Sequence, residues 1–242
     1  MNWHNRYSQQ AQWTRDLRAY VFNKINLNES CRVLEVGCGT GAILSEWPKG
    51  KSIHGIDIDP DALIQSRQHV AFANLIRGNA LQLPYADHSF DVLYCHFLLL
   101  WVNDPLQALL EMKRVTKSAG YVIAFAEPDY EHRVDQPGEL ISLGKWQTEA
   151  LRRQGADPCL GARLAELFYQ AGIPLIETGS IQSVGNDPTA EDREEEWAVI
   201  ETDLAGSVPD AEIQKMKLID TQAWANGKRV LQVPTYFAWG QI

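Results

Sequence analysis

The first half of this chain alternates between two hydrophobic patterns. The short apolar runs at Val33–Val36, Ile53–Ile58 and Phe90–His96 are typical of buried strands. Between them, Leu63–Ala73 carries apolar residues at helical spacing, and Pro60 suits the first turn of that helix. Strands that alternate with helices predict an α/β protein with a parallel sheet.

Two flanking segments extend this pattern. Gln9–Ile25 has apolar residues at helical spacing and predicts a helix before the first strand. Pro105–Thr116, with Asp104 as its N-cap, predicts a helix that leads into the strand Tyr121–Ala126.

The pattern loosens in the second half of the chain. Helices are predicted at Glu139–Gln154 and Gly161–Ala171, followed by a strand at Leu175–Val184. Residues 186–227 are acidic and helical, and Thr235–Gln241 is the last predicted strand.

A glycine loop and a carboxylate follow the first two apolar runs. Gly37-Cys38-Gly39-Thr40-Gly41 permits positive φ and close approach of a ligand to the backbone, and Ala42-Ile43-Leu44 is expected to begin a helix whose first N–H groups lack partners. Asp57 can accept two hydroxyl hydrogen bonds from a ribose. Because neighbouring parallel strands end at one crevice, loop and carboxylate together predict a nucleoside site.

The spacing of the glycines leaves the type of nucleoside open. Gly37-Cys38-Gly39-Thr40-Gly41-Ala42 also fits the dinucleotide fingerprint, so NAD is an alternative ligand. Glu35 is expected to place a second carboxylate in the crevice, which is unfavourable beside a pyrophosphate and harmless beside a cationic sulfonium.

The order of these motifs resembles that of the class I S-adenosylmethionine-dependent methyltransferases of the small-molecule type. The resemblance runs from about Arg32 to Glu127, through LEVGCGTG, GIDID, GNALQLPYADHSFDVLYCHFLLLW and EMKRVTKSAGYVIAFAEPD. It implies a Rossmann-like, doubly wound, seven-stranded sheet that is mostly parallel with an antiparallel last strand. It also implies transfer of a methyl group from S-adenosylmethionine to O, N or C of a metabolite, with S-adenosylhomocysteine as the product.

The same resemblance assigns cofactor contacts. The backbone from Glu35 to Gly41 would line the methionine part, Asp57 would bind the ribose, Ile58 would pack on the adenine, and Asn79 with Ala80 would meet the adenine edge. Family members more often carry Asp where this chain has Asn79. Arg15 is expected to pair with the cofactor carboxylate, and an exposed arginine on the helix face is the alternative. The full set of cofactor residues is Arg15, Glu35, Gly37, Cys38, Gly39, Gly41, Asp57, Ile58, Asn79, Ala80 and Cys95.

Catalytic and acceptor-binding candidates are fewer. His96, at the end of the fourth strand, is the candidate general base, and a packing histidine is the alternative. The candidate acceptor contacts lie in the leading segment, after the fourth strand and after the fifth strand: Tyr7, Trp13, Trp101, Glu127, Tyr130 and Arg133. Surface solvation is the alternative for the polar members of this set.

The additions to the sheet suggest how the acceptor is covered. We expect one methyltransferase domain over 1–242, an N-terminal helical lid at 1–30, and helical cap insertions at 128–160 and 186–228. A chain of 242 residues with 45% hydrophobic content can bury one full core, which fits this organisation.

Composition and charge limit the classes of molecule that this protein is expected to bind. The four cysteines form no C-x-x-C pair and predict a reduced cytoplasmic protein without a metal site. The net charge of −9, without a Lys/Arg-rich stretch, argues against nucleic acid. The longest apolar run, Phe97–Val102, is far short of the roughly 20 residues that span a bilayer. We expect a small-molecule acceptor as the partner of a monomer or homodimer.

Three functions remain open from the sequence. The first is methyl transfer to a small molecule, and the second is an NAD-dependent oxidoreductase. The third is a methyltransferase-like protein that binds the cofactor without transferring a methyl group.

Overall fold

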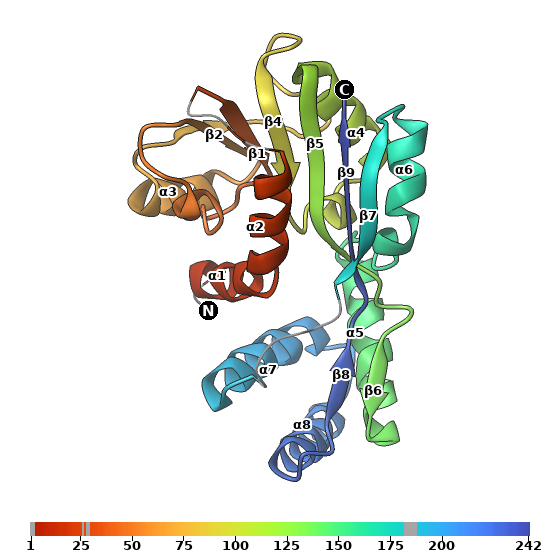
Figure 1. Cartoon of the computed structure of the whole chain (residues 1–242). Helices are drawn as coiled ribbons and strands as arrows, with labels where there is room; N and C mark the ends of the chain where they lie inside the picture. The colour runs from red at the N-terminus through yellow and green to blue at the C-terminus, as the bar shows by residue number, and fades with distance from the viewer. Residues whose placement is uncertain (1–2, 26, 28–29, 182–187) are drawn as a thin grey trace.

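A seven-stranded sheet forms the centre of the computed structural model, which describes residues 3–25, 27, 30–181 and 188–242 (Figure 1). The strands follow the spatial order β3-β2-β1-β4-β5-β9-β7. The first five are parallel neighbours, and β9 runs antiparallel to both β5 and β7. This arrangement confirms the predicted doubly wound sheet with an antiparallel last strand. The strands are β1 (Arg32–Val36), β2 (Ser52–Asp57), β3 (Asn74–Arg77), β4 (Phe90–Cys95), β5 (Thr116–Pro128), β7 (Leu175–Ile181) and β9 (Thr235–Gln241).

Helices cover both faces of this sheet. One face packs against α2 (Arg15–Lys24) and α3 (Pro60–His69), and the other against α4 (Pro105–Val115) and α6 (Leu164–Gln170). Because side chains alternate along a strand, Val33 joins the core under α2, while its neighbour Leu34 joins the core under α4. The residue parity at the end of each strand therefore decides which layer a side chain enters.

The predicted helix Gln9–Ile25 is two helices. Helix α1 spans Trp3–Trp13, α2 begins at Arg15, and Thr14 separates them. Thr14 has φ −111° and ψ 8°, and its hydroxyl lies 3.2 Å from the carbonyl oxygen of Ala11. Threonine can form such local bonds with the backbone in place of regular helical geometry, which accounts for the break.

The sequence also predicted a helix after the glycine loop. The structure has a single 3-10 turn there, Leu44–Glu46. Trp47 then leaves the turn in an extended conformation with ψ 139°. Pro48 follows it, and a proline disfavours helical geometry in the residue before it. The glycine loop is therefore followed by a short connection to β2.

Beyond the sheet, a second group of elements forms what we call the cap. It comprises β6 (Val134–Gln136), α5 (Ile141–Arg153), α7 (Ala190–Leu204), α8 (Asp210–Ala225) and β8 (Val230–Gln232). The antiparallel pair β6 and β8 was not predicted from the sequence. The cap has its own apolar core, which includes Leu143, Trp197, Ile200 and Met216. The last three residues predicted in the strand Leu175–Val184, and residues 186 and 187 of the acidic segment, lie outside the described residues.

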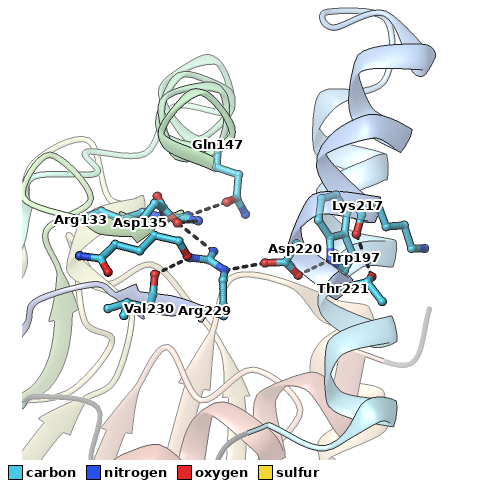
Figure 2. A network of polar contacts seen from close by, with 10 residues as sticks. Arg133, Asp135, Gln147, Trp197, Lys217, Asp220, Thr221, Arg229 and Val230 are labelled. Atoms are coloured by element: carbon cyan, nitrogen blue, oxygen red, sulfur yellow. Dashed lines mark hydrogen bonds and ion pairs between the residues drawn. The ribbon is translucent and has the colours of Figure 1, made fainter. Parts of the chain in front are cut away.

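A buried polar network ties the cap elements together (Figure 2). Asp135 of β6 accepts from Arg133 Nε at 2.7 Å and from Arg229 Nη2 at 2.8 Å. Arg229 also donates to Asp220 of α8 at 2.6 Å, and Asp220 accepts from Trp197 Nε1 of α7 at 2.9 Å. Each buried charge thus has an opposite charge or a hydrogen-bond donor beside it, as burial requires.

No described helix has the length and apolar character needed to cross a membrane. In the same part of the chain, no cluster of three or more His, Cys, Asp or Glu side chains is arranged to hold a metal ion.

Candidate functional site

The glycine loop after β1 is built on positive φ angles. Gly37, Gly39 and Gly41 have φ values of 75°, 49° and 79°. A Cβ on Gly37 would lie 2.7 Å from Leu98 Cδ1, and one on Gly41 would lie 2.5 Å from Ser66 Oγ. The loop therefore needs glycine both for its backbone conformation and for its close packing.

Asp57, at the end of β2, meets this loop as predicted. Its Oδ2 accepts from the N–H of Gly39 at 2.7 Å, and its Oδ1 accepts from the N–H of Asp59 at 2.9 Å. Each oxygen of a carboxylate can accept a second hydrogen bond, so the half-buried side chain can also bind hydroxyl groups. The next residue, Ile58, is 63% exposed and presents an apolar surface beside it.

Asn79 and Ala80 follow β3 in a tight turn. The side-chain oxygen of Asn79 accepts from the N–H of Leu81 at 2.9 Å, and the residue is exposed. Because the carbonyl is used within the turn, the NH₂ group is the part suited to bind a base edge. Ala80 is half-buried against the core under α4.

Glu35 does not face the predicted crevice. Its side chain is 3% exposed, on the strand parity that points under α2, and it accepts from the hydroxyl of Tyr94 at 3.0 Å. Burial, which outweighs this hydrogen bond and the nearby charge of Arg18, raises the pKa of Glu35 to about 8. Only the backbone of Glu35 can line a ligand site.

The thiols of Cys38 and Cys95 are buried as well. Burial is the main cause that raises both thiol pKa values well above the ordinary range, so both thiols stay protonated. The backbone atoms of Cys38, as predicted for the segment Glu35–Gly41, and those of Cys95 therefore stay the candidates for contact with the cofactor, and the thiols do not.

Helix α1 lies over the glycine loop. His4 Nδ1 is 2.9 Å from Thr40 Oγ1, and the His4 ring stacks on His69 of α3 with centroids 3.6 Å apart. A ring carbon of Tyr7 lies 3.5 Å from the position that a Cβ on Gly39 would take. Burial raises the pKa of Tyr7, and the charges of Asp57 and Asp59 add to this effect. Tyr7 thus lies beside Gly39 and near Asp57, the residues of the predicted nucleoside site.

Arg18, and not Arg15, is the arginine that α2 turns inward. Arg15 is exposed, whereas Arg18 is 2% exposed and donates to both carboxylate oxygens of Glu46, at 2.6 and 2.7 Å. Sequence reasoning missed Arg18. It lies on the same helical stripe as the buried residues Ala11, Thr14 and Val21, and a charged residue within such a stripe is the signal that could have identified it.

His96 follows β4 directly. Because Cys95 pairs with Val36 in the parallel register, His96 lies level with Gly37, the first glycine of the loop. Its Nε2 is 2.8 Å from the hydroxyl of Thr14. Burial, followed by the charge of Arg18, lowers the pKa of His96 to about 3. At neutral pH the ring is uncharged and weakly basic, which suits a hydrogen-bonding role better than the predicted role of general base.

Glu127 stabilises the turn after His96 through hydrogen bonds to its backbone. Phe97 has φ 49°, a strained value for a bulky residue. The fully buried carboxylate of Glu127 accepts from the N–H groups of Leu98, Leu99 and Leu100 at 2.9–3.1 Å. Burial raises the pKa of Glu127 to about 8, and the three N–H donors act in the opposite direction. The prediction that Glu127 contacts the acceptor is wrong, because both its oxygens bind this turn.

Of the remaining acceptor candidates, Arg133 is engaged inside the cap, whereas Tyr130, Trp13 and Trp101 stay candidates. Arg133 is paired with Asp135 inside the cap network, so its predicted acceptor contact is wrong. Tyr130 is half-buried after β5, where burial raises its pKa and the charges of Glu196 and Arg6 also act on it. Trp13 and Trp101 are 56% and 46% exposed, so their rings are accessible near the carboxyl ends of the strands.

Helix α1 also connects this region to the cap. Arg6 forms an ion pair with Glu196 of α7 at 2.5 Å, and Gln9 donates to Asp192 of α7 at 2.6 Å. In Figure 1, α1 accordingly lies between the sheet and α7. The structure thus brings Tyr7, Tyr130 and the N-terminal half of α7 to the same side of the sheet.

Known proteins are similar to this chain in sequence and in fold. Residues 34–124 match the family model described as a methyltransferase domain. The chain is 32% identical over 203 residues to a demethylmenaquinone methyltransferase of Geobacillus stearothermophilus, covering 71% of this chain and 81% of that protein.

Two solved structures have the same fold at lower identity. One is described as a methyltransferase of an antibiotic biosynthesis pathway in Anabaena variabilis, with a TM-score of 0.69, 14% identity, and coverage of 95% of this chain and 98% of that one. The other is the [4+2]-cyclase SpnF, with a TM-score of 0.57, 19% identity, and coverage of 93% and 80%. From its motifs, its sheet order and its relatives, the chain belongs to the class I S-adenosylmethionine-dependent methyltransferases.

Proposed function

We propose that this protein transfers the methyl group of S-adenosylmethionine to a small-molecule acceptor held between the carboxyl ends of the strands and the cap. The observation that carries the proposal is the contact between Gly39 and Asp57, which joins a cradle too tight for side chains to a carboxylate suited to ribose hydroxyls. When bound, the cofactor supplies a methyl carbon that is already activated by the sulfonium charge.

The roles of this chain's residues follow from their positions. Asp57 binds the ribose hydroxyls, Ile58 packs on the adenine, and the NH₂ group of Asn79 donates to the adenine edge. His96 accepts a hydrogen bond from the acceptor. Tyr7 and α1 cover the site and exclude water, so that the enzyme contributes mainly alignment and desolvation.

We infer that the acceptor carries a flat, largely apolar ring. Trp13 and Trp101 are large aromatic residues that stay exposed near the carboxyl ends of the strands, and such rings bind flat molecules by stacking. The relative named a demethylmenaquinone methyltransferase supports this direction. The methylated atom, O, N or C, is open, and transfer of labelled methyl to a panel of quinols, phenols, amines and carboxylic acids would identify it.

The Asp57→Ala variant tests the cofactor site. Loss of charge-assisted ribose hydrogen bonds, worth about 1.5 kcal/mol or more each, should weaken S-adenosylmethionine binding at least tenfold in calorimetric titration. Asp61→Ala removes an exposed carboxylate in the first turn of α3 and is the matched control, for which we expect unchanged affinity. Equal affinity of the Asp57 variant and the parent would contradict the assignment.

The same titrations separate the alternatives. Tight binding of NAD without binding of S-adenosylmethionine would indicate an oxidoreductase. Binding of the cofactor without methyl transfer to any member of the panel would favour a protein that uses the fold for other chemistry. The [4+2]-cyclase with this fold makes that second outcome a concrete alternative.

A further inference from the structure

We propose that Thr14 and Arg18 are positioning residues for His96, which would make the junction of α1 and α2 part of the acceptor site. Thr14 accepts a hydrogen bond from the Nε2–H of His96, which leaves Nδ1 to accept a hydrogen bond from the methyl acceptor. This inference rests on the proposed function, in which His96 contacts the acceptor.

All three nitrogens of the Arg18 guanidinium group donate hydrogen bonds. It binds Glu46 in the turn after the glycine loop through Nε and Nη2, and it donates from Nη1 to the carbonyl oxygen of Ala11 at 2.6 Å. The same Nη1 donates to the hydroxyl oxygen of Thr14. Arg18 is 2% exposed and Thr14 is 1% exposed, so water does not compete for these bonds.

The hydroxyl of Thr14 then has a restricted set of bonds. A hydroxyl has one hydrogen and two lone pairs, and Arg18 uses one lone pair. The carbonyl oxygen of Ala11, at 3.2 Å, can only accept, so it takes the hydroxyl hydrogen. The contact with His96 Nε2 at 2.8 Å uses the second lone pair, which requires a hydrogen on Nε2. All three contacts are satisfied together only in this arrangement.

The tautomer of His96 follows from these bonds. In a neutral imidazole, a hydrogen on Nε2 leaves Nδ1 as the acceptor. Burial and the charge of Arg18 both disfavour the protonated ring, which keeps His96 in its neutral form. The φ of 49° at Phe97 is a second observation at this point, because strained backbone is concentrated where a side chain must be aimed for function.

The tautomer can be measured in the unmodified protein. The ring nitrogen chemical shifts of ¹⁵N-labelled histidine, recorded with S-adenosylhomocysteine present, should show His96 with a hydrogen on Nε2 between pH 6 and 8. The Nδ1–H tautomer, or a protonated ring in this range, would overturn the proposal. This readout requires neither an identified acceptor nor a variant that folds.

Variants of Thr14 provide the second test. Thr14→Ser retains the hydroxyl and should keep kcat within about threefold of the parent, whereas Thr14→Val should lower kcat at least tenfold and leave the KM for S-adenosylmethionine within twofold. In a His96→Gln background, Thr14→Val should change kcat less than twofold, because the two residues act through one contact. Equal loss in the Ser and Val variants, or an undiminished effect of Val in the Gln background, would overturn the proposal.

Failure of the proposed function has a different signature. If His96→Gln leaves methyl transfer unchanged while ¹⁵N shifts show the expected tautomer, His96 is positioned but does not serve the acceptor. If the protein does not transfer a methyl group at all, the tautomer measurement still decides whether Thr14 and Arg18 orient the ring.

Discussion

Two buried carboxyl groups at the carboxyl ends of β1 and β5 have different partners. Glu127 accepts three backbone N–H groups, whereas Glu35 has Tyr94 as its hydrogen-bonding partner and the charge of Arg18 nearby. Each residue stabilises a turn or layer next to the ligand site without contacting a ligand through its side chain. Glu35, which accepts from Tyr94 and has no backbone N–H donor among the described residues, is the more informative group to titrate.

Glu35 should make the stability of the protein fall as pH rises. The pKa is raised from 4.5 to about 8 in the folded protein, so between these values the folded state holds a proton that the unfolded chain has lost. Stability is therefore highest below pH 4.5 with respect to this group and decreases as pH rises toward 8. Between pH 5 and 8, the free energy of unfolding of the parent should fall by roughly 2–4 kcal/mol relative to that of Glu35→Gln.

Denaturant unfolding of both proteins at several pH values checks this prediction. The difference between parent and variant isolates Glu35, because all other titrating groups are shared. A constant difference from pH 5 to 8 would show that Glu35 is ionised in the folded state. Its side-chain oxygen still accepts from Tyr94 in the Gln variant, so the hydrogen bond is retained.

At the scale of elements, the cap is a layer with its own core and its own polar network. Helix α8 supplies Asp220, which binds Arg229 before β8 and Trp197 of α7. Arg229 also binds Asp135 of β6. The network therefore connects segments that lie about 90 residues apart in the sequence, Asp135 and Arg229 being 94 residues apart. Removal of Asp220 leaves the buried Arg229 to share the single carboxylate of Asp135 with Arg133.

Asp220→Ala should destabilise the cap and spare the cofactor site. Loss of one partner of a buried ion pair costs about 3–5 kcal/mol, because Arg229 stays buried. We expect a lower melting temperature and reduced methyl transfer, with S-adenosylmethionine affinity within threefold of the parent. Asp210→Ala, in the exposed first turn of the same helix, is the control and should lose about 0.5 kcal/mol. A parallel loss of cofactor affinity would mean that cap and sheet unfold as one unit.

At the scale of the whole molecule, α1 contacts both the glycine loop and the cap. It reaches the glycine loop through His4 and Tyr7, and α7 through Arg6 and Gln9. A ligand that orders the glycine loop should therefore also order α1 and the first half of α7.

Hydrogen exchange with and without S-adenosylhomocysteine measures this coupling. We expect slower exchange in residues 3–13 and 190–197, and unchanged exchange in residues 210–225, which lie on the far side of the cap from α1 (Figure 1). Protection of α8 equal to that of α1 would contradict a specific route through α1. Unchanged exchange in α1 would mean that its contacts with the loop do not respond to the ligand.

Local features of the chain predicted six of the seven strands and the glycine loop, whereas β3 (Asn74–Arg77) was not located and the antiparallel last strand was implied by the family resemblance. The alternation of apolar runs with helical spacing predicted the parallel strands, and Thr235–Gln241 is a strand over its full predicted length. The positions of the glycines predicted the loop, and the acid after β2 predicted its partner. The spacing of apolar residues, the turn glycines and the residues at strand ends are all local features of the sequence. The sequence by itself therefore determined these strands and the glycine loop.

The tertiary structure alone decided which polar side chains serve the site. Glu35 and Glu127 stand at strand ends, but parity and neighbouring backbone N–H groups turn them into the interior. Arg133 is engaged by Asp135, itself bound to Arg229 from a distant segment, and Arg18 is held by Glu46. The pairing of a buried polar group depends on whatever the fold brings against it. Tyr94, Glu46 and Arg229 come from other elements, and the two-residue spacing of Arg133 and Asp135 does not by itself show that they pair, so no local pattern predicts these partners.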